Sequence, residues 1–139
     1  MQIRPYKPSD QSNVIDLWVR CELVKPWNNP LKDIERKLQV SPELFFVGES
    51  HGEIVATAMA GYDGHRGSVN YLAVSPDARK IGFGRELMEH VENLLTERGC
   101  PKINLQIRLT NSRAAEFYKA IGYNVDEVTG MGKRLIPDN

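Results

Sequence analysis

Arg79-Lys80-Ile81-Gly82-Phe83-Gly84 lies between an apolar segment, residues 69–74, and a segment with helical periodicity, residues 87–95. The first backbone N–H groups of a helix lack partners, and the helix dipole favours negative charge there. Gly82 and Gly84 let a ligand approach the backbone closely, and Arg79 and Lys80 add positive charge at the same place. The pattern predicts a strand, a phosphate-binding loop and a helix, in that order.

Two common phosphate-binding loops do not fit this stretch. A Walker loop needs a Gly-Lys-Ser/Thr ending, which is absent. A dinucleotide-binding loop needs a third glycine where Leu87 stands, and an acidic residue after the next strand, which here ends at Arg108. The remaining pattern, Arg-x-x-Gly-x-Gly, on its own also fits a helix start whose glycines only permit close packing.

A second segment adds information because it follows the next predicted strand. After residues 105–108 comes an Ala-rich stretch that begins at Asn111, contains Tyr118 and ends at Gly122-Tyr123. Asn111 suits the N-cap of a helix, and Gly122 suits its C-terminal end. We therefore expect strand, Asn cap, helix and Gly-aromatic in succession.

Together, the two segments resemble the two halves of the cofactor site in the GNAT superfamily of acetyl-CoA-dependent N-acetyltransferases. Within that superfamily, the stretches Pro26–Pro30, Gly61–Ser68 and Gly132–Ile136 are similar to the small bacterial YpeA-type acetyltransferases. The resemblance runs from about Ile3 to Ile136. It implies an acetyl-CoA cosubstrate, an amine acceptor and direct transfer between them.

The pattern of apolar residues and turn signals agrees with that family's fold. We expect one GNAT domain over residues 1–139, of the α/β (α+β) class. Its mixed, mostly antiparallel sheet should have six to seven strands, with helices on both faces. The predicted strands are residues 3–6, 44–49, 54–62, 69–74, 103–107, 123–128 and 131–136. The predicted helices begin near Ser9, Leu31, the glycine loop and Asn111.

Composition excludes several classes of function. The chain has a formal net charge of +0, which argues against a general nucleic-acid or membrane-surface binder. It has no apolar run of membrane-spanning length and no signal-peptide core, so we expect a cytoplasmic protein. Cys21 and Cys100 form neither a disulfide framework nor a metal-ligand pair, and we expect no metal.

The resemblance assigns the cofactor-binding residues. A bulge in the strand before the glycine loop would leave backbone groups of Leu72, Ala73 and Val74 free to bind the pantetheine arm. This arm would lie in the gap where the strand of residues 69–74 diverges from the strand of residues 103–107. The loop Arg79–Gly84 would bind the pyrophosphate, and a side chain such as Asp at Gly84 would block it. The full expected set is Leu72, Ala73, Val74, Arg79, Lys80, Ile81, Gly82, Phe83, Gly84, Asn111 and Tyr118.

The resemblance also assigns catalytic roles. Tyr118 matches the tyrosine that family members use as a general acid for the departing thiolate. The sequence lacks the family's usual general base. Two groups of members carry a glutamate at one of two positions, which here hold Ser68 and Gln106. Neither side chain can accept a proton near neutral pH. The alternatives are His65, Asp63 if desolvated, or a chain of water molecules.

The acceptor would bind near the first two helices, the loop that joins them and the Asp63–Arg66 hairpin, with Trp27, Tyr62 and Gln106 as its contacts. The sequence thus predicts an N-acetyltransferase that acts on a primary amine of a metabolite, peptide or protein. One alternative is a non-catalytic or regulatory CoA-binding module, which the missing glutamates favour; another is transfer from a different acyl-CoA. Many members of that family form homodimers, and the sequence does not decide between a monomer and a homodimer.

Overall fold

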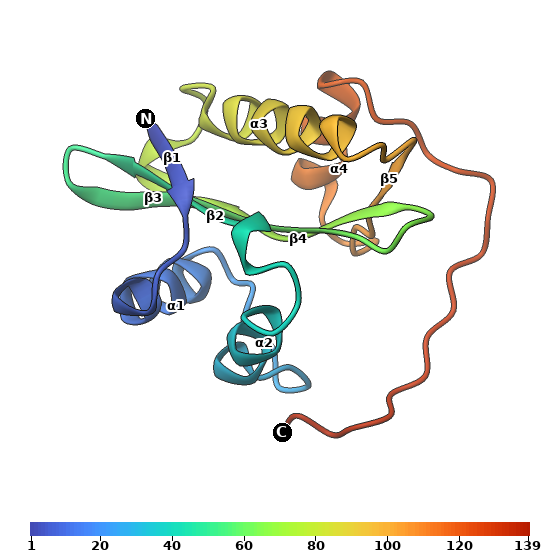
Figure 1. The fold of residues 1–139 in the computed structure, drawn as a ribbon, viewed down its shortest axis with the longest axis horizontal. Helices are drawn as coiled ribbons and strands as arrows, with labels where there is room; N and C mark the ends of the chain where they lie inside the picture. Colours follow the sequence, from blue (N-terminus) through green and yellow to red (C-terminus); the bar gives the residue numbers. More distant parts are fainter.

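A five-stranded mixed sheet forms the centre of the protein (Figure 1). The computed structural model describes all residues, Met1–Asn139. The sheet order β1-β2-β3-β4-β5 equals the chain order, and every neighbouring pair is antiparallel except β4–β5. The strands are β1 (Gln2–Pro5), β2 (Phe45–Ser50), β3 (Glu53–Tyr62), β4 (Gly67–Val74) and β5 (Ile103–Asn104). The helices are α1 (Gln11–Arg20), α2 (Pro30–Lys37), α3 (Phe83–Glu97) and α4 (Ser112–Ala120).

Helices cover both faces of the sheet, as predicted. Figure 1 shows α3 and α4 on one face and α1 and α2 on the other. Successive strand residues point to opposite faces, so Phe45 joins the core under α1 and α2, whereas Phe46 joins the core under α3 and α4. None of the helices is both long enough and apolar enough to cross a lipid bilayer.

The first four strands and all four helices confirm the predicted elements, with ends shifted by a few residues. Three short 3₁₀ turns also occur, at Pro8–Asp10, Pro42–Leu44 and Pro76–Ala78. The helix after Asn111 begins as predicted, because the Asn111 side chain accepts a hydrogen bond from the Ala114 N–H at 3.1 Å. Gly122 follows the end of this helix with a φ of +103°, a conformation that favours glycine.

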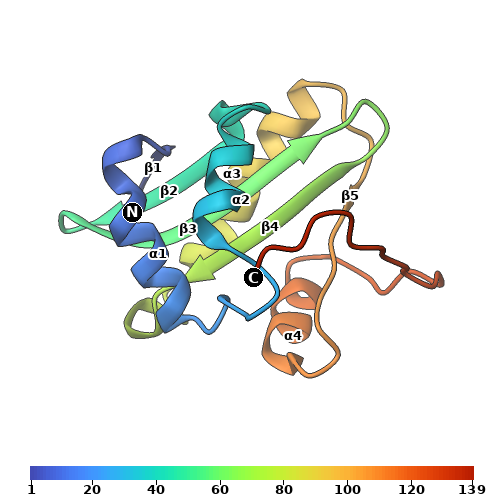
Figure 2. The ribbon, with the colours of Figure 1, turned by 90° about the horizontal axis from the view of Figure 1, so that it is seen from below.

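The predicted count of six to seven strands was wrong. Residues 123–128 and 131–136 run as irregular chain, and their apolar side chains are exposed, with Met131 91% and Leu135 84% accessible. A strand needs a partner edge, and β5 offers only two paired residues before it leaves the sheet. The segment instead crosses to α2 (Figure 2), where Asp138 pairs with Arg36 through two 2.7 Å bonds.

Strands β4 and β5 separate soon after they meet. Gly67 pairs with Ile103 and Ser68 pairs with Asn104, and no further pair follows. Residues 105–108 continue without strand partners, so the edge of β4 beyond Ser68 faces no neighbouring strand. This divergence gives the V-shaped opening that the resemblance implies.

A β-bulge in β4 lies beside this opening, as predicted. Thr57 pairs with Ala73 and Met59 pairs with Asn70, so Tyr71 and Leu72 together oppose a single residue of β3. Tyr71 has a φ of +52°, a left-handed conformation that costs a non-glycine residue about 1–2 kcal/mol. Local contacts must therefore hold the bulge in place.

Those contacts centre on Thr57, which is completely buried. Its Oγ1 accepts a hydrogen bond from Trp18 Nε1 at 2.8 Å and donates one to the Tyr71 carbonyl at 2.9 Å. The Trp18 and Tyr71 rings stack with centroids 3.8 Å apart. Helix α1 and the bulge are thus joined through one hydroxyl, and Trp18 is a core residue.

We expect Thr57→Val to lower the free energy of unfolding by at least about 2 kcal/mol, because the valine leaves a buried indole N–H and a carbonyl without partners. Urea denaturation measures the change. Thr96→Val is the matched control: Thr96 is exposed and bonds only within α3, so its effect should stay within about 0.5 kcal/mol. Equal stability of the two variants would contradict the role of Thr57.

Candidate active site

The glycine loop leads directly into α3. Gly82 is the N-cap residue with a φ of +99°, and no side chain caps this helix. The first helical bond runs from the Glu86 N–H to the Gly82 carbonyl at 3.0 Å, so the N–H groups of Phe83, Gly84 and Arg85 have no helical acceptor. Lys80 is exposed in the same loop. The loop therefore presents free N–H groups and positive charge, which suit an anion.

Gly84 serves the packing of two helices. A Cβ atom at Gly84 would lie 3.0 Å from the Phe117 ring and 3.6 Å from Val74 Cγ2. A side chain there would press on the Phe117 ring of α4. Asp at this position would therefore also bury a charge between α3 and α4. The expected block of the pyrophosphate stays a prediction.

The backbone at the end of β4 has more hydrogen-bond partners than the sequence suggested. The Val74 carbonyl accepts a hydrogen bond from Arg79 Nε at 3.3 Å and a weak one from Cys21 Sγ at 3.3 Å. The Val74 carbonyl is therefore not one of the free backbone groups that the sequence predicted, and the role of Val74 in cofactor binding stays a prediction. Leu72 lies in the bulge, and Ala73 pairs with Thr57 on the β3 side only. Their other edge faces the opening.

Tyr118 lies on α4 and is buried, with 8% of its surface exposed. Its ring contacts Phe117 and Tyr123 edge to face, at centroid distances of 5.1 Å and 5.4 Å. Its hydroxyl has no hydrogen-bond partner within the protein. Burial raises the pKa of the phenol well above its usual range, so the group stays protonated near neutral pH and can act as a donor.

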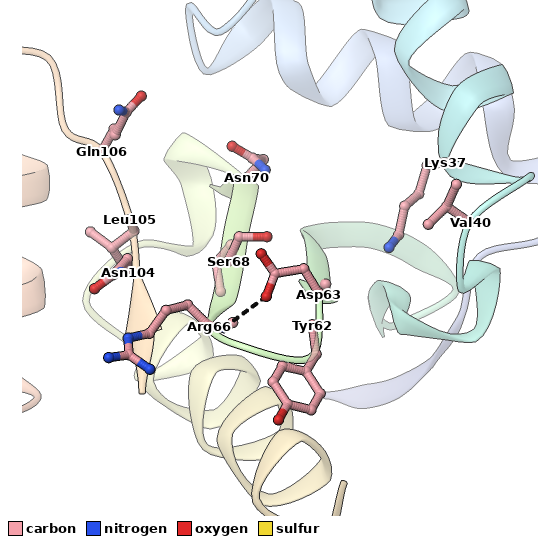
Figure 3. A pocket seen from close by; sticks show the side chains of 13 residues that line it. Lys37, Val40, Tyr62, Asp63, Arg66, Ser68, Asn70, Asn104, Leu105 and Gln106 are labelled. Carbon is pink, nitrogen blue, oxygen red and sulfur yellow. Dashed lines mark hydrogen bonds between the residues drawn. The ribbon is translucent and has the colours of Figure 1, made fainter. Parts of the chain in front are cut away.

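A cavity of about 580 Å³ lies where β4 and β5 separate (Figure 3). It brings together Tyr62, Asp63 and Gln106, which sequence analysis had placed near the acceptor, and Ser68, which stands where some family members carry a glutamate. The rest of its lining is Lys37, Val40, Gly61, Arg66, Gly67, Val69, Asn70, Asn104 and Leu105. Figure 3 shows Ser68 and Asn70 between Lys37 on one side and Gln106 on the other. The Tyr62 hydroxyl points away from them, toward the carbonyls of Gly64 and Gly99.

The two sequence-predicted bases occupy the β3–β4 hairpin. Asp63 Oδ1 accepts hydrogen bonds from the N–H groups of His65 and Arg66, each at 2.7 Å. These bonds lower the pKa of the Asp63 carboxyl and make it a weaker base. Because Asp63 is exposed, the desolvation that its predicted role required is absent. The His65 side chain is exposed and does not line the cavity.

Trp27 is 47% exposed and lies outside the cavity lining. The Arg108 guanidinium lies 4.7 Å from the centre of its ring, a cation–π distance. This contact joins the α1–α2 loop to the unpaired segment after β5. Trp27 therefore lies at the opening between β4 and β5, on the side of α1 and α2.

Sequence analysis missed a hydrogen-bond network around Tyr71. The Tyr71 hydroxyl donates to Asp33 Oδ2 and accepts from Asn28 Nδ2, both at 2.6 Å. Burial and the Asp33 carboxylate raise the pKa of Tyr71. Nothing in the sequence pairs these residues, because the positive φ that directs Tyr71 toward α2 arises only in the folded bulge.

Lys37 was also missed. It ends α2, is half-buried, and its ammonium group donates to the Ala60 carbonyl at 2.5 Å. In the sequence it is one of several charged residues on a polar helix, and only the position of α2 over β3 places it at the cavity.

The chain is similar to known proteins over nearly its whole length. A protein described as acetyltransferase YE1169 of Yersinia enterocolitica is 48% identical over 138 residues, 99% of this chain and 98% of the relative. The ribosomal-protein-S18-alanine N-acetyltransferase of Escherichia coli is 25% identical with a TM-score of 0.74, over 88% of this chain and 77% of that structure. Chaetomium thermophilum Naa20, solved with a bisubstrate analogue, is 27% identical with a TM-score of 0.73, over 90% and 72%.

A sequence model of the acetyltransferase (GNAT) family matches residues 12–123, which include the bulged strand, the glycine loop and the helix that carries Tyr118. The family model and the full-length relatives agree with the fold and with the order of these elements. This chain belongs to the acetyltransferase (GNAT) family.

Proposed function

We propose that this protein is an acetyl-CoA-dependent N-acetyltransferase that moves the acetyl group directly to a primary amine. The observation that carries the proposal is the arrangement around the β4–β5 opening. The cavity lies where the two strands separate, and Tyr118 belongs to the core cluster against which Leu72, Val74, Leu105 and Ile107 of the diverging segments pack. The free N–H groups of the α3 N-terminus lie beside the end of β4, where a Cβ atom at Gly84 would be 3.6 Å from Val74. Family membership and the solved N-acetyltransferases with the same fold support it.

The residues of the glycine loop fit the cofactor's phosphates. The N–H groups of Phe83, Gly84 and Arg85 are free of helical acceptors, and Lys80 is exposed beside them. The unpaired edge of β4 near Leu72 and Ala73 would hold the pantetheine amides. Acetyl-CoA supplies the activated thioester.

The protein must then assist the acetyl transfer in three ways. The amine nitrogen forms a bond to the thioester carbon and the carbon–sulfur bond breaks, so negative charge develops first on the carbonyl oxygen and then on sulfur. We propose that a backbone N–H of the bulge stabilises the negative charge on the carbonyl oxygen. We assign the proton for the thiolate to the Tyr118 hydroxyl, which has no other partner in the protein.

The amine must lose a proton to react. The cavity surface near β4 and β5 carries Ser68, Asn70 and Gln106, which form hydrogen bonds but are not bases at neutral pH. We propose that water held by these groups carries the proton to solvent. Asp63, with its lowered pKa, and the exposed His65 are weaker candidates.

Tyr118→Phe should lower kcat by roughly 10²-fold while leaving acetyl-CoA affinity and the melting temperature nearly unchanged, because the lost hydroxyl makes no bond in the protein. Thiol release from acetyl-CoA, with pools of amines, amino acids and N-terminal peptides as acceptors, measures it. Tyr6→Phe is the matched control: it removes the buried, unpartnered Tyr6 hydroxyl beneath α1 and should keep full activity.

Wild-type activity that persists in Tyr118→Phe would exclude Tyr118 as the acid. Tight acetyl-CoA binding without thiol release from any pool would instead favour the non-catalytic CoA-binding module. Faster release from succinyl- or propionyl-CoA would point to a different acyl donor.

A second prediction concerns the loop. The double variant Arg79→Gln and Lys80→Gln should weaken CoA binding by about tenfold or more, because two charges near the phosphates are lost. S-acetylpantetheine, which lacks those phosphates, should bind wild type and variant equally. Calorimetry measures both affinities. Lys102→Gln is the control, because Lys102 precedes β5 and pairs with Asp126. An equal loss for both ligands would refute the phosphate role.

A further inference from the structure

The most unusual group in the 580 Å³ cavity is the Lys37 ammonium. It is half-buried and has no carboxylate within ion-pair distance. Its single protein partner is the Ala60 carbonyl at 2.5 Å, although an ammonium group can donate three hydrogen bonds. A desolvated charge with so few partners is costly unless a ligand completes its shell.

The surroundings of Lys37 leave room for such a ligand. Gly61 lies beneath it: a Cβ atom there would be 3.8 Å from Lys37 Nζ and 3.3 Å from Ser68 Oγ. The absence of a side chain at Gly61 therefore keeps the space between the ammonium and the Ser68 hydroxyl open. Figure 3 shows the Lys37 side chain directed toward this part of the cavity.

Nearby charges do not neutralise Lys37. Glu43 is the carboxylate with the largest influence on it, but Glu43 already pairs with Arg98 at 3.0 Å. Asp63 lines the same cavity, yet its Oδ1 is occupied by two backbone N–H groups. Arg66 adds a second cation that forms no ion pair. Burial lowers the pKa of Lys37, which is the signature of a charge that lacks compensation.

The remaining cavity lining carries no charge. It combines apolar residues such as Val40 and Leu105 with the amides of Asn70, Asn104 and Gln106 on the β4 and β5 sides. This leaves a positive site at α2 and a hydrogen-bonding surface toward the bulge. We propose that the acceptor carries a carboxylate, which Lys37 binds, and that its amino group lies on the Asn70 side. The acceptor class is thus a small amine with a carboxylate, such as an amino acid. This inference rests on the proposed function.

Paired acceptors test the proposal through kcat/KM. Each pair differs only in its terminal group: glycine and glycinamide, β-alanine and β-alaninamide, 4-aminobutyrate and 4-aminobutanamide. For at least one pair, the ratio of kcat/KM for the carboxylate to that for the amide should fall about tenfold in Lys37→Met, because a charge-assisted bond is lost. Intrinsic differences between the amines cancel when the ratios of variant and wild type are compared.

Two further variants separate recognition from stability. Lys37→Arg keeps the charge and should keep most of the preference for carboxylates. Lys32→Met removes an exposed lysine of the same helix that does not line the cavity, and should change nothing. The proposal would be overturned if the carboxylate-to-amide ratio of kcat/KM were the same in Lys37→Met and wild type. It would also be overturned if this ratio fell as much in Lys32→Met as in Lys37→Met.

A binding experiment does not depend on catalysis. Glutarate should shift the amide NMR signals of Gly61 and Ser68 in wild type but not in Lys37→Met, whereas glutaramide should shift neither. Thiol release without carboxylate preference would refute this inference and leave the proposed function intact. Glutarate binding that requires Lys37, without thiol release from any amine, would refute the proposed function and leave a carboxylate-binding cavity. Equal shifts by glutarate and glutaramide would refute the inference directly.

Discussion

The hydroxyl of Thr57 holds the feature on which the rest of the site depends. It connects Trp18 of α1 to the carbonyl of Tyr71, and so fixes a left-handed residue in the middle of a strand. Without that residue, β4 would continue in regular register with β3, and its edge would stay straight beyond Ser68. The bulge at Tyr71 and Leu72 interrupts the strand just beyond Ser68, the last residue that pairs with β5, and it borders the opening.

The same bulge positions groups on the α1–α2 side. Because Tyr71 has a positive φ, its ring lies on Trp18 and its hydroxyl reaches α2, where it bonds to Asp33. Asp33 lies 3.5 Å from Arg36, which in turn binds Asp138. A polar chain therefore runs from the bulge to the last residues of the protein.

Much of the fold could be predicted from the sequence because the signals are local. The Asp63-Gly64 turn, the Asn111 cap and the Gly122 end are each set by a few neighbouring residues, and the structure shows all three. The last two predicted strands failed because pairing depends on a distant edge. Residues 123–128 and 131–136 contain apolar side chains between turn signals, but β5 is too short to receive them. Gly84 was predicted as a ligand contact, and only the position of Phe117 in the fold reveals that it also serves helix packing.

The order of the strands has a consequence for biosynthesis. Each strand pairs with the strand before it in the chain, so the four antiparallel strands and both helices of one face are complete once Val74 has been made. The parallel pair β4–β5 must wait for the whole of α3 and closes through only two residue pairs. We expect a nascent chain to build the α1–α2 half first, as local contacts form before distant ones. The edge of β4 would then stay exposed to chaperones and to other nascent chains until synthesis has passed Asn104.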